Sequence, residues 1–151
     1  MKGSWAGAMG QCQFMPSSFM RFAVDGNGDG RRDIWNSLPD VFASTANYLT
    51  QSGWKSGEHW GREVRLPARA RPDWVGLDTQ RPLSEWARLG VHLKDGSALP
   101  ARDDLDASLV QPDGPGGRAF LVYGNYRVVM KWNRSTYFAT TVGLLADRLG
   151  I

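Results

Sequence analysis

The sequence predicts an α+β protein, and two observations support that prediction. Apolar residues recur at helical spacing near both ends of the chain, within residues 16–49 and 135–149. Between these ends, residues 55–131 hold most of the eight prolines, with short apolar runs separated by Gly and Asp, a pattern typical of short strands and turns. A small antiparallel sheet is marginal alone, so we expect a helix to cover it.

Residues 1–54 form the first of three predicted regions and contain two helices. Pro16 suits the first turn of the first helix, because proline lacks the N–H that this turn leaves unpaired. Ser37 and Asp40 have the Ser-x-x-acid spacing of a capping box, so the second helix is predicted to begin there. Gly53 is predicted to end it.

Residues 55–131 form a predicted β-rich subdomain. Within it, residues 63–66 alternate like an edge strand, and residues 84–89 have the spacing of one or two helical turns. Four arginines in this region could contact an anionic partner, although their alternation with Leu, Pro and Ala is also typical of an edge strand leading into a loop: Arg62, Arg65, Arg69 and Arg71.

The distal part of the chain is predicted to be a β-hairpin followed by a helix. Apolar runs at 120–123 and 126–130 flank Gly124-Asn125, a two-residue hairpin signal. Residues 132–151 are predicted to pack back on the core as a helix. Gly143 costs this helix about 1 kcal/mol relative to Ala, so we expect tertiary packing to hold it. Its predicted apolar face comprises Phe138, Val142, Leu145 and Leu149.

Composition excludes several classes of protein. The 151 residues are 42% hydrophobic and 22% charged, which is ordinary globular usage. No apolar run approaches the ~18 residues of a membrane-spanning helix. A net charge of +3 is too small to indicate nucleic-acid binding. The single cysteine, Cys12, excludes an internal disulfide, and with only His59 and His92 beside it a Cys/His zinc site is excluded too.

Residues 25–36 match most of a twelve-residue calcium loop, with Gly30 at the sharp turn. The closing position holds one amide oxygen where a bidentate Glu is expected, although Asp40 could reach in. We therefore expect weak, structural Ca²⁺ binding with a Kd of about 10⁻⁴–10⁻³ M, and the alternative is a Gly- and Asp-rich turn without an ion. The candidate ligands are Asp25, Asn27, Asp29, the carbonyl of Arg31, Asp33 and Asn36.

By physical criteria alone, residues 13–16 are typical of a helix entry with a hydrophobic staple. The run Ala-Gly-Ala-Met-Gly-Gln-Cys-Gln-Phe-Met-Pro-Ser-Ser at residues 6–18 nevertheless resembles the B-type family of lytic murein transglycosylases. The resemblance covers the whole chain in order. It continues through the Asp-rich loop and Asp-Ile-Trp-Asn at 33–36, Ala-Asn-Tyr-Leu at 46–49, Gly-Asn-Tyr-Arg at 124–127 and Trp-Asn-Arg-Ser-Thr-Tyr at 132–137.

The resemblance implies half of a goose-lysozyme-like helical core with an EF-hand-like loop, a small antiparallel β subdomain and a C-terminal helix. It also implies cleavage of the β-1,4 bond between N-acetylmuramic acid and N-acetylglucosamine in peptidoglycan. The muramoyl 6-hydroxyl would close to a 1,6-anhydro product, with one glutamate acting first as acid and then as base. The implied protein is a monomer that binds peptidoglycan glycan strands, in the periplasm or at the outer membrane of a Gram-negative bacterium.

The same resemblance implies which residues line the glycan cleft: Ser4, Gln13, Phe14, Tyr48, Trp132 and Asn133. For Asn133 the alternative is that it caps the C-terminal helix, or that Ser135 does so. The family's catalytic glutamate precedes the Gly-Ser-x-Ala-Gly-Ala-Met-Gly motif, which begins here at residue 3. We therefore expect that glutamate, and any signal peptide, upstream of Met1, and none of the catalytic residues within the chain. The alternative function is a non-catalytic peptidoglycan-binding module.

Overall fold

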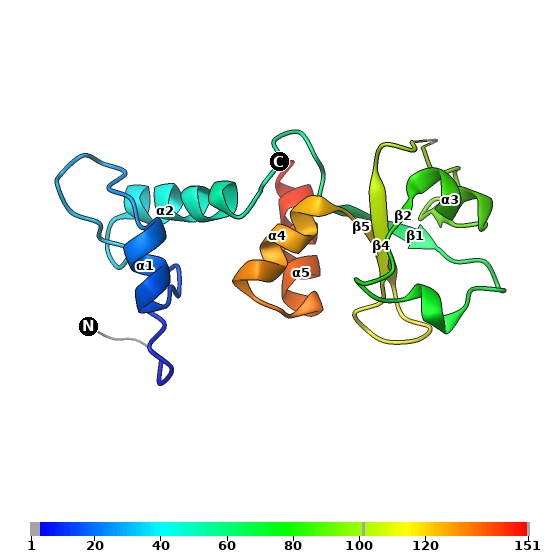
Figure 1. Ribbon diagram of the computed structural model, residues 1–151, viewed down its shortest axis with the longest axis horizontal. Coiled ribbons are helices and arrows are strands. Elements are labelled where there is room, and N and C mark those ends of the chain that lie inside the picture. The colour runs from blue at the N-terminus through cyan, green and yellow to red at the C-terminus, as the bar shows by residue number, and fades with distance from the viewer. Residues whose placement is uncertain (1–3, 101, 151) are drawn as a thin grey trace. The chain divides into compact units, whose positions relative to one another are not determined.

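The structure, a computed structural model, describes residues 4–100 and 102–150. The chain divides into two compact units, one ending at Trp54 and the other beginning at Lys55. Helices α1 (Pro16–Phe22) and α2 (Leu38–Gln51) belong to the first unit, and an antiparallel sheet with further helices forms the second (Figure 1). The fold class is α+β, as the sequence predicts.

The two helices of the first unit begin where their capping signals predict. Pro16 is the first residue of α1. The Ser37 hydroxyl precedes α2 and accepts a hydrogen bond from the Asp40 N–H at 3.4 Å. α1 ends at Phe22, whose ring packs edge-on against Tyr48 of α2, with 4.8 Å between ring centroids. This aromatic contact joins the two helices into one small core.

The sheet of the second unit has five antiparallel strands in the order β2-β4-β5-β1-β3. Strand β1 pairs with β5 on one side and β3 on the other, so the prediction of an edge strand at residues 63–66 is wrong. The strand that covers this edge, β3, is two residues long and leaves no alternating pattern in the sequence. The strands are β1 (Gly61–Arg65), β2 (Arg81–Pro82), β3 (His92–Leu93), β4 (Asp106–Val110) and β5 (Ala119–Val122).

Helices cover both faces of this sheet, which explains why β5 is buried along its whole length. Its side chains alternate between two cores, as the two-residue period of a strand requires. Ala119 and Leu121 face a core that includes Trp86 of α3 (Leu83–Arg88). Phe120 and Val122 face a second core formed with α4 (Gly124–Trp132) and α5 (Thr136–Leu149).

The hairpin predicted around Gly124-Asn125 is a strand-to-helix junction instead, because residues 126–130 lie in α4. A two-residue hairpin turn of this type needs left-handed backbone at both positions. Neither residue has it, since Gln13 is the only non-glycine with positive φ among the described residues, and Gly124 is not among the glycines that have it. The run at 126–130 resembles a strand because it is short and apolar and includes two adjacent valines, and periodicity alone does not distinguish such a run from a buried helix segment.

Helix α5 turns its small residues, not its large ones, toward the core. Ala139, Thr140 and Gly143 are buried, whereas the predicted apolar face is exposed, from 36% at Phe138 to 66% at Leu149. The reason is a close approach by Trp60, since a Cβ built on Gly143 would lie 2.3 Å from the indole Cδ2. Within residues 4–100 and 102–150, every helix is too short or too polar to span a bilayer.

Candidate functional site

A tight turn precedes α1 and carries the first group of candidate residues. Met9 and Phe14 close it through two backbone hydrogen bonds of 2.9 and 3.0 Å. The turn lies against Ile34, because the backbone N–H of Gln11 donates to the Ile34 carbonyl at 2.8 Å. A Cβ at Gly10 would come within 2.6 Å of the Ile34 side chain, so only glycine allows this approach.

Gln13 is exposed and lies at the strained position of this turn. Its φ of 51° places it in the left-handed region, uniquely among the non-glycine residues that the structure describes. Its side-chain amide nitrogen donates to the Gly10 carbonyl at 2.8 Å. Such backbone strain costs of the order of 1–3 kcal/mol and is concentrated at functional sites. The turn therefore presents Gln13 at the surface in a fixed orientation.

The neighbouring aromatic residues form a layered arrangement. Phe14 is only 3% exposed and packs on Tyr48, with 5.7 Å between ring centroids. Tyr48 is half-buried, so it is the member of this pair with surface to offer a ligand. Ser4 is exposed, and its hydroxyl accepts from the Ala8 N–H at 3.1 Å. Four of the six predicted cleft residues thus belong to the first unit.

Trp132 and Asn133, the other two, belong to the second unit. Trp132 is the last residue of α4, and Asn133 lies between α4 and α5, so a helix and not a strand precedes Asn133. Asn133 is exposed and follows the last residue of α4, and its side-chain oxygen accepts from the Ser135 N–H at 3.0 Å. Ser135 caps α5, because its hydroxyl accepts from the Phe138 N–H at 3.2 Å. Ser135 is therefore the residue that caps α5.

The Asp-rich loop of residues 25–36 is folded by hydrogen bonds from its own backbone. The Asp25 carboxylate accepts from the N–H groups of Gly28 at 2.7 Å and Gly30 at 2.8 Å. The Asp29 carboxylate accepts from the Arg31 N–H at 2.8 Å, and the Asn27 amide nitrogen donates to Asp29 at 3.2 Å. These oxygens are of the kind that Ca²⁺ prefers. Among the described residues, no group of three or more His, Cys, Asp or Glu side chains is arranged to hold a metal ion.

Asp40 ties the two ends of this loop together from the first turn of α2. Its carboxylate is fully buried and accepts from the Gly26 N–H at 2.9 Å and the Asp33 N–H at 2.7 Å. Burial raises the pKa of this carboxyl, but these N–H donors and the Ser37 hydroxyl outweigh burial and hold the pKa below its ordinary value. The sequence indicated that Asp40 could reach into the loop, and it does so as an acceptor for backbone N–H groups at both ends of the loop.

The three glutamates of the chain all have protein partners. Glu58 accepts from the Asn125 N–H at 3.2 Å, at the start of α4. Glu63 lies 2.7 Å from the Arg118 guanidinium, and Glu85 forms an ion pair with Arg81. None of the three therefore stands as a free general acid.

A helical unit with an Asp-rich loop, together with a sheet covered by helices, is the architecture expected of a lytic transglycosylase. The chain belongs to the transglycosylase SLT domain family, whose pattern it matches over residues 1–147. It is 33% identical to membrane-bound lytic murein transglycosylase B of Escherichia coli K12, over 100% of this chain and 40% of that protein. The chain thus spans less than half the length of this relative.

Solved structures of related enzymes have the same fold. SltB3 of Pseudomonas aeruginosa, in complex with NAG-NAM-pentapeptide, is 51% identical with a TM-score of 0.93, over 98% of this chain and 40% of that one. Slt35 of Escherichia coli, in complex with calcium, is 33% identical with a TM-score of 0.79, over 97% of this chain and 45% of that one. These relatives therefore bind a peptidoglycan fragment in one case and calcium in another.

Proposed function

We propose that this chain is part of a lytic transglycosylase that cleaves the β-1,4 bond between N-acetylmuramic acid and N-acetylglucosamine and leaves a 1,6-anhydro product. The observation that carries this proposal is the family match over residues 1–147. The strained, exposed Gln13 within the family's motif supports it. Because the substrate is peptidoglycan, the protein acts in the cell envelope, in the periplasm or at the outer membrane.

In this proposal the cleft residues bind and orient the glycan. The Gln13 amide and the Ser4 hydroxyl offer donors and acceptors to the acetamido and hydroxyl groups of an amino sugar. Tyr48 offers an aromatic surface to a sugar ring, and buried Phe14 fixes the orientation of Tyr48 from below. Asn133 and Trp132, which belong to the second unit, would offer a glycan strand an amide and an aromatic surface of their own.

The proposal assigns the acid–base step to a glutamate outside these 151 residues. A general acid at neutral pH needs a raised pKa and access to the glycosidic oxygen. The Arg118 guanidinium instead lowers the pKa of Glu63 to about 2, against burial and with help from Lys94. We therefore expect the chain by itself to bind glycan strands without cleaving them. The same observation favours the alternative function, a non-catalytic peptidoglycan-binding module.

Co-sedimentation with purified peptidoglycan sacculi tests the binding half of this proposal. The chain should pellet with sacculi in a saturable manner. Gln13→Ala should weaken this binding at least fivefold without changing the melting temperature. Gln51→Ala, at an exposed glutamine of α2, is the matched control and should bind like the parent. Equal binding by the Gln13 variant would remove this residue from the cleft.

For the Asp-rich loop we propose weak Ca²⁺ binding through the first four of the predicted ligands. The chemistry of the donors fits, since Asp25, Asn27 and Asp29 supply hard oxygens and the Arg31 carbonyl adds another. Asp33 and Asn36 hydrogen-bond to each other at 3.0 Å, and Asp40 joins the loop ends, so these three support the loop. The bound ion would add charge stabilisation to a turn that α1 and α2 flank.

A further inference from the structure

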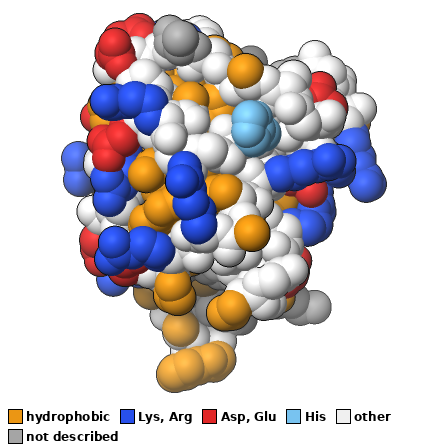
Figure 2. Space-filling model, turned by 90° about the vertical axis from the view of Figure 1, so that its right-hand side faces the viewer, with side chains coloured by type: hydrophobic (Ala, Val, Ile, Leu, Met, Phe, Trp, Pro, Cys, Tyr) orange, Lys and Arg blue, Asp and Glu red, His pale blue; other side chains and the backbone are white. Residues whose placement is uncertain are grey.

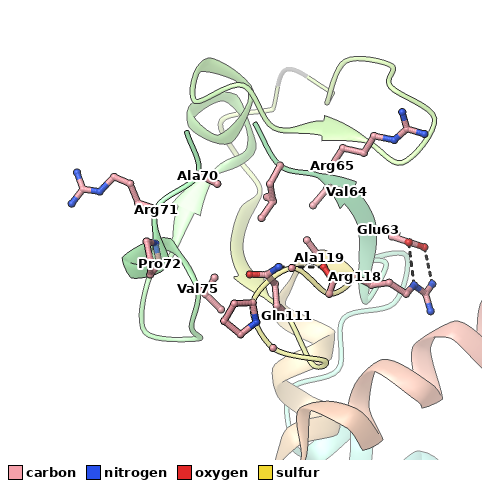
Figure 3. A pocket seen from close by; sticks show the side chains of 15 residues that line it. Glu63, Val64, Arg65, Ala70, Arg71, Pro72, Val75, Gln111, Arg118 and Ala119 are labelled. Carbon is pink, nitrogen blue, oxygen red and sulfur yellow. Dashed lines mark hydrogen bonds and ion pairs between the residues drawn. The ribbon is translucent and has the colours of Figure 1, made fainter. Parts of the chain in front are cut away.

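The cavity of the sheet-bearing unit offers a ligand little charge to recognise. It measures about 860 Å³ and lies between β1, residues 70–75 and the loop that joins β4 to β5 (Figure 3). Arg118 is bound to Glu63 at 2.7 Å, and Arg65 and Arg71 point away from the hollow. On the face shown in Figure 2, acidic side chains likewise lie among the basic ones. The charged side chains around this cavity therefore contact the protein or solvent and not the cavity.

Gln11, by contrast, makes a long-range contact in the first unit that the proposed glycan binding does not yet involve. It is exposed, yet its side-chain amide nitrogen donates to the Trp35 carbonyl at 2.9 Å, 24 residues further along the chain. Its backbone N–H donates to the Ile34 carbonyl at 2.8 Å. Gln11 therefore ties the turn of residues 9–14 to two successive carbonyls near the end of the Asp-rich loop.

The segment that accepts these bonds is held firmly in place. The Asp33 carboxylate accepts from the Trp35 N–H at 2.9 Å, and Phe19 of α1 packs on the Trp35 ring with 5.8 Å between ring centroids. The fully buried Asp40 carboxylate accepts from the Asp33 N–H at 2.7 Å. Residues 33–35 therefore form a fixed platform for the turn.

The turn needs such support because its backbone is strained at Gln13. The φ of 51° at this residue is a conformation that persists only where surrounding contacts impose it. The side-chain nitrogen and the backbone N–H of Gln13 both donate to the Gly10 carbonyl, at 2.8 and 3.2 Å. These two bonds fix Gln13 relative to the turn, but they do not fix the turn relative to the rest of the unit.

Two segments of the first unit hold the turn itself. Buried Cys12 and Phe14 anchor it on α2, since the Cys12 thiol lies 3.6 Å from the Val41 carbonyl and Phe14 packs on Tyr48. Gln11 supplies the side-chain hydrogen bond to the platform, which is a different segment. Because Gln11 is exposed, this bond can be removed without changing the core.

We propose that Gln11 is a positioning residue for glycan binding: its hydrogen bond to Trp35 holds the turn on the platform and so fixes the direction in which Gln13 meets the sugar. The proposal rests on the proposed function, because it requires that Gln13 contacts the glycan. Gln11 acts through Gln13 and does not touch the glycan itself. The loss of its bond therefore cannot weaken binding more than the loss of the Gln13 side chain does.

Co-sedimentation of the 151-residue chain with purified peptidoglycan sacculi tests the proposal. Gln11→Met keeps the length of the side chain but removes the donor, so it should weaken binding about three- to tenfold, the change that one neutral hydrogen bond corresponds to. Gln11→Lys keeps an N–H donor of similar reach and should bind within about twofold of the parent. Gln51→Met is the matched control and should bind like the parent, because Gln51 is also exposed and donates to Asn47 of its own helix at 2.9 Å.

A double variant distinguishes positioning from direct contact. If Gln11 acts through Gln13, adding Gln11→Met to Gln13→Ala should cause no further loss of binding. Additive losses would make Gln11 a glycan ligand and overturn the proposal. Parent-like binding by Gln11→Met, or equal losses in Gln11→Met and Gln11→Lys, would overturn it as well.

Amide hydrogen exchange, followed by NMR without glycan, tests the same contact independently of binding. Gln11→Met should speed exchange of the backbone N–H at position 11 about threefold or more, because the turn opens more often from the platform, and Gln51→Met should not. Unchanged exchange would overturn the proposal. Failure of the parent to pellet with sacculi would overturn the proposed function and the positioning role with it. A parent that binds, together with a Gln11→Met variant that binds equally, would overturn the positioning role alone.

Discussion

Replacing Gly143 with alanine should destabilise the sheet-bearing unit, although alanine is the better helix former. The new methyl group would lie 2.3 Å from Cδ2 and 2.4 Å from Cε2 of Trp60. Trp60 cannot easily move aside, because its ring is buried against Phe120 and Tyr126 and its indole N–H donates to Asp147 of the same helix at 3.0 Å. The glycine therefore serves a close approach between α5 and the indole.

The expected loss in the free energy of unfolding is the difference between two opposing contributions. Alanine gains about 1 kcal/mol of helix propensity, while overpacking costs about 1–3 kcal/mol and lies at the upper end where a rigid ring must shift. The net loss of about 2 kcal/mol should lower the melting temperature by roughly 8–15 °C for a unit of this size, measured by circular dichroism. Thr141→Ala, on the exposed side of α5, is the control and should change stability by less than about 0.5 kcal/mol.

A companion variant separates the clash from a general effect on the helix. Trp60→Leu removes the ring, so Gly143→Ala added to it should cost less than it costs in the parent. An unchanged or higher melting temperature for Gly143→Ala in the parent would refute the close-approach argument.

Three further predictions concern charge, the loop and the cleft. Because Arg118 lowers the pKa of Glu63 to about 2, the pair should stabilise the fold above pH ~4.5 by about 1 kcal/mol after solvent screening. That contribution should fade as the pH drops toward 2. Arg118→Gln should therefore make the melting temperature fall less steeply with decreasing pH. An unchanged slope would exclude a contribution of this pair to stability. Millimolar Ca²⁺ should raise the melting temperature more than Mg²⁺ does, and Asp25→Ala should remove the increase. If the melting temperature of this variant still rises with Ca²⁺, the loop is a turn that does not bind the ion. In a chimera that carries this chain in place of the matching part of the Escherichia coli relative, Asn133→Ala should cut turnover at least tenfold at constant melting temperature. Ser135→Ala should cost about 1 kcal/mol of stability and keep turnover, and the reverse pattern would make Asn133 structural.

Local signals predicted the elements whose ends carry their own chemistry. Pro16 marks the start of α1, Ser37 marks the start of α2, and both helices begin where expected. The α4 helix was missed because nothing beside it in the sequence reveals its start. The backbone N–H of Asn125, in the first turn of α4, donates to the Glu58 carboxylate, 67 residues earlier, at 3.2 Å. A long-range cap of this kind leaves no local pattern.

The candidate site likewise has features that the sequence predicts and features that depend on contacts between distant parts of the chain. The motif around Gln13 could be recognised from the sequence, but its left-handed backbone could not, because that conformation depends on how the turn rests on Ile34. The sequence predicts that Arg65 and Arg71 either contact an anionic partner or belong to an edge strand that leads into a loop. In the structure Arg71 forms an ion pair with Asp73 at 2.6 Å, and Arg65 lies in β1, which is paired on both sides.

Muropeptide analysis of digested sacculi tests the central claim most directly. Sacculi are incubated with the 151-residue chain, with the Escherichia coli chimera, or with buffer. The soluble products are then separated, and their masses are determined by mass spectrometry. The chimera should release 1,6-anhydro muropeptides, and the chain alone should release none, because its three glutamates are held by protein partners. Release of 1,6-anhydro products by the chain alone, or release of reducing-end products by the chimera, would contradict the account.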